Sequence, residues 1–342
     1  MKRIVNLLLA ATFVAAMPML ALAQTAEEQA EWDKVVEAAK QEGTVTIYSG
    51  QMGVPYHPEI ARLFTEKYGI KVEILEARAS ELQERIRTEQ TTNRVAGDFS
   101  HNGGSSGAFL EASGFYQPHG WMPNLSKLKE EFATNGTQFA IYVQPYGILV
   151  NPNLVSEADM PKSWHDLTDP KWKGKILADD FRALGGGSAF FNVTYRKLGR
   201  EFHEKLAQQN IVFSRQIRDN PRRVARGEFA IYIPLSVPDM LLNEGLPLKA
   251  VMPEEGLPFI TYDVAVFANA PHPNAAKLLM NFFLEDEAQL VYAKSGRAQT
   301  ITGADDKVPE NIRYLTDVKL MGEPDPSTTT ETLKIAKEIY GE

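Results

Sequence analysis

The fold class follows from residues 44–75, which have the sequence TVTIYSGQMGVPYHPEIARLFTEKYGIKVEIL. The run Thr44–Tyr48 is rich in β-forming residues and predicts a strand. Apolar residues then recur at helical spacing over Pro58–Phe64, Gly69 ends that helix, and Ile70–Leu75 alternates as a second strand. Two strands separated by a crossover helix are typical of a parallel sheet, so this stretch indicates an α/β protein.

The same alternation continues on both sides of this stretch, with about 25 to 30 residues per unit. A short strand is expected to end at Asp98-Phe99, and helical patterns dominate from Pro273 onward. Helices are expected at residues 26–41, 81–89 and 189–198, and strands at residues 146–150, 175–179, 229–233, 248–252 and 261–267. The sequence shows no internal repeat and no low-complexity linker.

The first residues have the pattern of a signal peptide. Lys2 and Arg3 precede an apolar run from Ile4 to Leu22, and the small residues of Ala21-Leu22-Ala23 come before a polar, Glu-rich segment. We expect residues 1–23 to be removed by cleavage after Ala23 and the mature chain to reach the periplasm. A retained membrane anchor is the competing interpretation.

Composition restricts the class of protein. About 320 residues follow the expected cleavage position, which is enough for two domains that each bury a core. The chain has no cysteine, so disulfides and thiolate chemistry are excluded. The net charge of −8 argues against nucleic acid or an anionic membrane surface as a partner. Local arginines and backbone amides can still form a positive pocket for an anionic ligand.

One segment carries a family resemblance. Residues 163–176, with the sequence SWHDLTDPKWKGKI, resemble the segment that identifies periplasmic solute-binding proteins of the ferric-ion, thiamine, phosphonate and sugar-phosphate group. Residues 146–154, 226–233 and 270–276 match the same pattern in order. The resemblance spans nearly all of the mature chain.

The resemblance implies the type II periplasmic-binding fold, in which two α/β lobes are joined by two crossing hinge strands and enclose a ligand cleft. The crossing strands would be 146–150 and 262–267. Lobe one would consist of residues 24–145 plus 266–342, and lobe two of residues 146–265. The family closes its lobes around the ligand by hinge motion and docks on an ABC permease of the inner membrane. We expect a monomer.

Three loops are candidates for the ligand site, because ligands of open α/β sheets bind outside the carboxyl ends of the strands. Two of them are rich in glycine and run into helix starts, where free amides and the helix dipole favour an anionic group. The alternative is that their glycines form turns and their serines cap helices. The candidate residues in the three loops are Ser49, Gln51, Asn102, Ser105, Ser106, Arg182, Gly187 and Ser188.

Five further residues complete the candidate site. Arg215 could bind a carboxylate or phosphate, although the run of arginines from 215 to 226 is also typical of a solvated helix face. Tyr146, Tyr232 and Tyr262 stand at strand ends near the expected cleft, and each could instead be a core residue. Asp263 could accept from a ligand hydroxyl or ammonium group, or bond to backbone at the hinge.

Metal binding and catalysis have weaker support. Ferric receptors of the resembling group typically use two adjacent tyrosines, whereas the matching segment Ile231–Leu235 has only Tyr232. His57 and Glu59 form the best remaining metal-ligand pair, and a helix start explains them equally well. No HExxH, Gly-x-Ser-x-Gly or P-loop motif is present. We therefore expect no metal, no cofactor and no catalytic residue.

The sequence favours a periplasmic receptor that captures a small organic anion, such as a carboxylate, phosphonate or sugar phosphate. The paired glycine-rich loops and Arg182 motivate this hypothesis. A ferric-ion receptor is the alternative. A periplasmic enzyme built on the same two lobes is a third hypothesis, for which the sequence offers no nucleophile or acid–base pair.

Overall fold

The computed structural model describes residues 16–341, so the first part of the expected signal peptide lies outside the described residues. Helix α1 (Ala16–Glu42) continues through the expected cleavage position after Ala23. Its second half packs on the protein, because Trp32 and Ala39 are buried in the core of the first lobe. None of the described helices is both long enough and apolar enough to cross a membrane.

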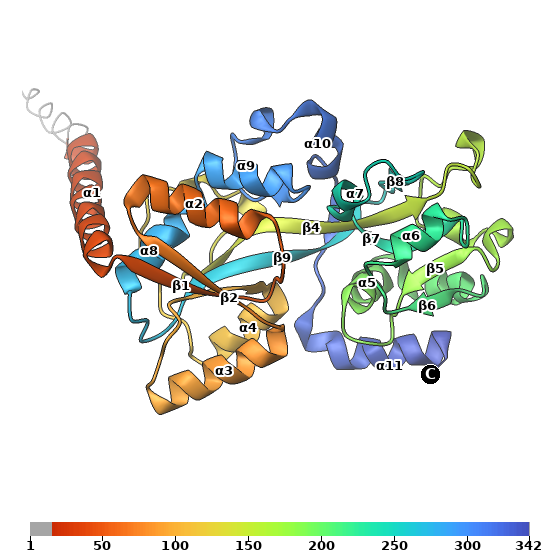
Figure 1. Cartoon of the computed structure of the whole chain (residues 1–342), viewed down its shortest axis with the longest axis horizontal. Helices are drawn as coiled ribbons and strands as arrows, with labels where there is room; N and C mark the ends of the chain where they lie inside the picture. Colours follow the sequence, from red (N-terminus) through yellow and green to blue (C-terminus); the bar gives the residue numbers. More distant parts are fainter. Residues whose placement is uncertain (1–15, 342) are drawn as a thin grey trace, which may run out of the picture.

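The strands form one continuous, curled sheet with the order β2-β1-β3-β9-β4-β7-β5-β6, and three short strands pair beside this path. Figure 1 shows β4 and β9 running along the length of the molecule, with helices grouped at either end. The strands are β1 (Thr44–Ser49), β2 (Lys71–Glu76), β3 (Phe99–Gly103), β4 (Gln138–Val150), β5 (Ile176–Asp179), β6 (Val212–Ser214), β7 (Ile231–Ser236), β8 (Lys249–Val251), β9 (Leu257–Val266), β10 (Ala298–Gln299) and β11 (Leu320–Gly322).

The first lobe is the α/β unit predicted from residues 44–75. β1 pairs in parallel with both β2 and β3. Apolar residues of α2 and α8, including Phe64 and Phe282, pack face to edge in its core. The helices of this lobe are α1, α2 (Tyr56–Tyr68), α3 (Ala79–Thr92), α4 (Gly104–Ala112), α8 (Pro273–Phe282) and α9 (Asp286–Lys294). Its architecture confirms the predicted α/β class.

The second lobe repeats the parallel arrangement, since β5 pairs in parallel with β6 and β7. Its core contains Trp164, Phe181 and Phe190. The helices of this lobe are α5 (Gly186–Ala207), α6 (Asn220–Ala225) and α7 (Asp239–Leu242). Residues 163–176, which carry the family resemblance, contain two short 3₁₀ turns and lead into β5. Trp164 of this segment is buried, and its indole donates to the Gly256 carbonyl at 2.9 Å.

The two lobes are joined by the antiparallel pair β4 and β9. Residues 138–145 of β4 pair with β9, and residues 146–150 pair with β7 and β8 of the second lobe. Both strands begin earlier than the sequence predicts, β4 at Gln138 and β9 at Leu257. The result is the expected fold, with two lobes and two crossing strands.

The C-terminal segment packs on the second lobe, unlike the expected assignment of residues 266–342 to lobe one. Helix α10 (Glu310–Thr316) and helix α11 (Thr329–Tyr340) contribute Ile312, Leu315 and Ala336 to the second core. The Tyr340 hydroxyl bonds the buried His203 ring of α5 at 2.8 Å. Figure 1 shows α11 beneath α5. The amphipathic face of α11 finds its apolar partner there, so the chain passes between the lobes a third time.

Candidate functional site

A cleft of about 990 Å³ lies between the lobes and is bordered by both of them. This size is typical of a small-molecule site. The first lobe contributes residues 51–55, which follow β1, and Lys294, Ser295 and Arg297, at and after the carboxyl end of α9. The second lobe contributes most of residues 215–222 and 238–243, while the crossing strands contribute Gln144, Tyr146 and Tyr262. A second cavity of about 460 Å³ lies beside β10 and β11, away from the strand ends that the fold class uses for ligands.

Five of the residues predicted for the ligand site line this cleft: Gln51, Tyr146, Arg215, Tyr232 and Tyr262. They come from both lobes and from both crossing strands. Gln144 donates to the Tyr146 hydroxyl at 3.2 Å, which orients that side chain on β4. Burial raises the pKa of the three tyrosines above the ordinary value, so their hydroxyls are neutral donors at physiological pH.

The glycine-rich loop of the first lobe differs from its prediction. β3 continues to Gly103, so His101 and Asn102 belong to a buried strand and not to a loop. Asn102 donates to the Ser100 hydroxyl at 2.9 Å. Ser105 and Ser106 belong to the first turn of α4, and Ser106 is not among the described residues that line the cleft. This segment was predicted as a ligand loop because it is rich in glycine and leads from a strand end into a helix start, whereas in the structure β3 runs directly into α4.

Two other predicted residues lie behind the cleft wall. The Ser49 hydroxyl is fully buried and bonds His101 Nδ1 at 3.1 Å and His57 Nε2 at 3.3 Å. Asp263 is paired with Asn102 across the sheet, and a Cβ atom on Gly104 would lie 3.3 Å from its Oδ2 atom. The Asp263 carboxylate thus occupies the start of α4, where the sequence predicts a ligand anion.

The glycine-rich loop of the second lobe holds a carboxylate of the chain itself. The Gly187 amide, in the first turn of α5, donates to Asp179 Oδ2 at 2.7 Å, and the Asp180 amide donates to Asp179 Oδ1 at 2.9 Å. Ser188 caps the same turn through the Gly185 amide and carbonyl. Burial raises the pKa of the Asp179 carboxyl, although the two amides oppose the shift. The start of α5 is therefore capped internally, which was the alternative interpretation.

Arg182 is also engaged within the protein. Its Nε donates to Asp180 Oδ1 at 2.8 Å, and Nη1 donates to the Gly341 carbonyl at 3.2 Å. The guanidinium carbon lies 4.5 Å from the centre of the Phe213 ring. Arg182 is not among the described residues that line the cleft, because these contacts hold it beside the C-terminal helix.

The cleft contains a buried arginine that the sequence did not single out. Arg297 lines the cleft, is 8% exposed, and forms no salt bridge within the described chain, although its charge opposes the rise in the pKa of Asp239 across the cleft. Its guanidinium carbon lies 4.5 Å from the centre of the Tyr56 ring and 5.3 Å from that of Tyr142. Nη1 donates to the Ser295 carbonyl at 3.0 Å, whereas Nε has no partner within the described chain. A buried cation with a free donor is costly unless another molecule supplies an acceptor.

The backbone around Arg297 explains its position. Gly296 ends α9 at φ +76°, and a Cβ there would lie 3.0 Å from Pro238 Cα of the second lobe. The Arg297 amide donates back to the Tyr292 carbonyl at 3.1 Å. Only glycine combines this conformation with so close an approach. The turn therefore places Arg297 at the junction of the two lobes.

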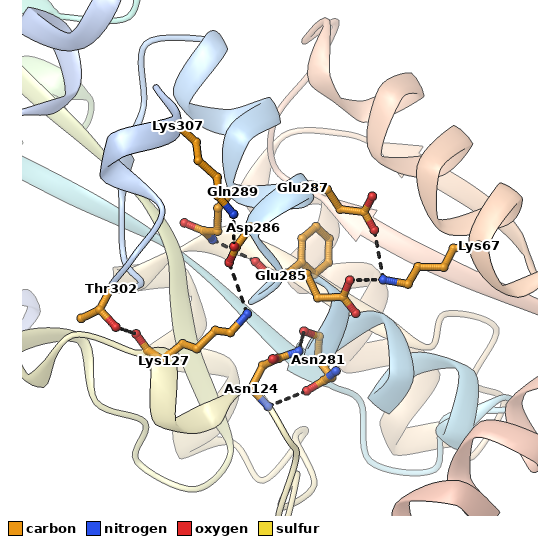
Figure 2. Close-up of polar contacts among 11 residues, drawn as sticks. Lys67, Asn124, Lys127, Asn281, Glu285, Asp286, Glu287, Gln289, Thr302 and Lys307 are labelled. Carbon is orange, nitrogen blue, oxygen red and sulfur yellow. Dashed lines mark hydrogen bonds and ion pairs between the residues drawn. The ribbon is translucent and has the colours of Figure 1, made fainter. Parts of the chain in front are cut away.

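Polar contacts at its amino end fix helix α9 to the first lobe, as Figure 2 shows. Asp286 is paired with Lys127 at 3.2 Å and with Lys307. Lys67 of α2 reaches Glu285 and Glu287 on the other side. The buried amide of Gln289 donates to the Ile141 carbonyl of β4 at 2.7 Å. These contacts hold the helix, and with it Arg297, in a constant relation to a crossing strand.

The cleft is positively charged although the chain is acidic. Its lining contains five basic residues and three acidic residues: Arg215, Arg218, Arg222, Lys294 and Arg297, against Asp179, Asp219 and Asp239. Burial raises the pKa of the Asp179 and Asp239 carboxyls. The predicted arginine run divides in two, since Arg223 and Arg226 pair with Glu228 outside the cleft. The local field favours an anion.

The described residues contain no group of three or more histidine, cysteine, aspartate or glutamate side chains placed to hold a metal ion. His57 and Glu59 do not form a pair. Glu59 binds Arg62 at 2.7 Å, and His57 Nδ1 contacts Glu76 at 2.6 Å. Tyr232 is the one tyrosine of its strand and bears a neutral phenol, so a ferric ion would have to displace its proton.

Comparison with known proteins gives a consistent result. Residues 102–316 match a family model described as bacterial extracellular solute-binding protein. An uncharacterized protein of Haemophilus influenzae is 24% identical over 275 residues, which cover 76% of this chain and 78% of that protein.

Solved structures with a similar fold include two ferric-ion proteins. Iron-bound HitA from Pseudomonas aeruginosa has a TM-score of 0.68 at 22% identity, covering 86% of this chain and 99% of that chain. The ferric binding protein from Campylobacter jejuni has a TM-score of 0.71 at 22% identity, covering 86% and 98%. AfuA from Actinobacillus pleuropneumoniae, solved with fructose-6-phosphate, has a TM-score of 0.63 at 22% identity, covering 87% and 96%. Likeness at this level of identity shows the shared fold.

Proposed function

The chain belongs to the bacterial extracellular solute-binding protein family, whose members deliver solutes to ABC importers, and from this premise we propose that its ligand is a small organic anion. The family consists of binding proteins, so we also propose that the ligand leaves the cleft chemically unchanged.

Arg297 is the observation that carries the proposal. Its guanidinium is buried in the cleft wall, forms no salt bridge among the described residues, and keeps Nε free. A carboxylate or phosphate would neutralise the charge and accept from Nε, forming a charge-assisted hydrogen bond. Tyr56 and Tyr142 hold the guanidinium plane in place, so little side-chain entropy remains to be lost when the anion binds.

Closure of the lobes would complete the site. Arg297 belongs to the first lobe side of the cleft, whereas Arg215 and Arg218 belong to a loop of the second lobe. An anion seated on Arg297 would attract the opposite loop and favour the closed form. A ligand shifts such an equilibrium only through its different affinity for the two forms, and a charge bound by both lobes supplies that difference.

A ferric-ion receptor is the competing function, favoured by Tyr146, Tyr232 and Tyr262 in the cleft lining. Two features weigh against it. Burial disfavours the phenolate form of all three tyrosines, and the cleft presents a surplus of positive charge to a cation. Iron carried together with an organic anion would still use Arg297 as the anion contact.

Thermal unfolding of the mature chain with a panel of anions tests the proposal. A bound anion should raise the melting temperature in proportion to the logarithm of its concentration over Kd, and high salt should weaken the effect. Ferric nitrilotriacetate and ferric chloride serve as the competing ligands. A shift with iron alone, accompanied by a phenolate charge-transfer band in the visible spectrum, would overturn the proposal.

A further inference from the structure

We propose that the anion carries an apolar body, as an aliphatic or aromatic monocarboxylate does, and that this body contacts Met52, Ile217 and Leu242. The inference rests on the proposed function, because it assigns the remainder of the molecule whose charged group binds Arg297. It separates this cleft from one made for a bare phosphate, a polyhydroxylated sugar phosphate or a metal ion.

Three apolar side chains inside the cleft are exposed to solvent. Met52 is 47% exposed, Ile217 is 42% exposed and Leu242 is 73% exposed, and all three line the cleft. Met52 belongs to the loop after β1 in the first lobe. Ile217 follows β6, and Leu242 ends α7, both in the second lobe. Exposed apolar side chains that gather at one concave site, on walls that face each other, indicate a binding surface.

Further apolar groups of the lining extend the surface formed by these three side chains. Prolines 55, 221, 234 and 238 line the same cleft, and proline has no amide to donate. Val54 and Leu241 complete the apolar part of the lining. An alkyl chain or an aromatic ring placed against these apolar groups would bury apolar surface, whereas a hydroxyl group placed there would have no partner, which lowers affinity.

The charged anchor and the apolar side chains come from different segments of the lining. Arg297 follows α9, whereas Met52 follows β1, Leu242 ends α7, and Ile217 lies in the loop that also carries Arg215 and Arg218. A molecule with a charged end and an apolar body could contact Arg297 and these side chains together. Met52 suits an apolar ligand of varied shape, because its unbranched, polarisable side chain adapts to different partners.

Packing of the three side chains against one another on closure is the competing explanation. In that case they would act as a latch between the lobes and would strengthen the binding of every ligand to the same extent. A matched pair of ligands distinguishes the two, namely hexanoate and gluconate, which are both six-carbon monocarboxylates. Inorganic phosphate serves as an anion without an organic body.

Isothermal titration calorimetry on the mature full-length chain would measure all three ligands. We expect hexanoate to bind roughly tenfold or more tightly than gluconate, with a more negative heat-capacity change, because it buries apolar surface. Replacing Leu242→Gln should weaken hexanoate binding by roughly tenfold and leave phosphate binding unchanged. Leu184→Gln is the matched control, since Leu184 is 72% exposed and is not among the described residues of the cleft lining.

Each remaining outcome has a definite meaning. Gluconate or phosphate binding more tightly than hexanoate would overturn the apolar body and leave the anion proposal standing. Equal weakening of all three ligands by Leu242→Gln would identify a latch and likewise overturn the inference. Absence of binding by all three anions and by a wider panel of carboxylates would overturn both proposals.

Discussion

Replacement of Arg297→Met should weaken anion binding by roughly 10-fold to 150-fold while the ligand-free protein keeps its stability. Methionine has a similar length and no charge, so it fills the space between Tyr56 and Tyr142 without a free donor. The variant loses the bond from Nη1 to the Ser295 carbonyl and two cation–π contacts, each worth about 1 kcal/mol. It also loses the cost of burying an unpaired charge, which is of similar size or larger. The lost contacts and the removed cost of burying the charge oppose each other, so the free energy of unfolding should stay nearly the same.

The affinity for the anion has no such compensating contribution. A charge-assisted bond from a buried guanidinium to a carboxylate contributes about 1.5 to 3 kcal/mol, which corresponds to a loss of roughly 10-fold to 150-fold in affinity. The assay is the thermal shift of each variant with and without the anion, followed by calorimetry for Kd. Arg94→Met is the matched control, because Arg94 is exposed, pairs with no carboxylate in the described chain and lies outside the cleft lining. An unchanged Kd in Arg297→Met would refute the role that we give to this arginine.

Three further predictions concern the scaffold. Burial, and then the carboxylates of Glu323 and Glu111, raise the pKa of Asp263 to about 7, above its unfolded value of about 3.9. The free energy of unfolding should therefore fall by up to about 4 kcal/mol as the pH rises from 4 to 7. Asp263→Asn should remove this slope in urea denaturation measured across that range, and a parallel slope in the variant would disprove the assignment. Gly296→Ala should cost about 2 kcal/mol more than Gly303→Ala in the same assay, since both have positive φ but only Gly296 meets backbone at 3.0 Å. Truncation after residue 325 should lower hydrogen-exchange protection in α5 and β5 while β1 and β2 keep theirs, because α11 packs on the second core; equal losses in both lobes would contradict that placement.

The fold could be predicted because its signals are local. Alternation in residues 44–75 and the glycine at position 69 identify strands and a helix without reference to the rest of the chain. The extent of β3 could not be predicted in this way. Ser100, His101 and Asn102 are polar, and what makes them strand residues is the pairing of β3 with β1 and β9, neighbours that only the folded structure supplies. Likewise, the pattern of α11 shows an apolar face but does not say which lobe will cover it.

Part of the candidate site could also be predicted from local signals in the sequence. Strand ends identified Gln51, Tyr146, Tyr232 and Tyr262, because the carboxyl ends of strands are a property of the fold class. Gly187 matched an anion-binding pattern, yet its amide is taken by Asp179, eight positions earlier in the chain. Arg297 has no pattern of its own. The available signal is Gly296 directly after a helix, which predicts a turn but not the tyrosine rings that the turn brings to the arginine.

The four tryptophans have a practical consequence for studying this protein in solution. Trp32 and Trp121 contact each other edge to face in the first lobe, at 6.5 Å between ring centres, and Trp164 and Trp172 belong to the second core. None of the four is among the residues that border the cleft. Tryptophan fluorescence should therefore change when either lobe unfolds and should change little when the ligand binds. Ligand binding is better followed by the absorbance of the tyrosines near Arg297.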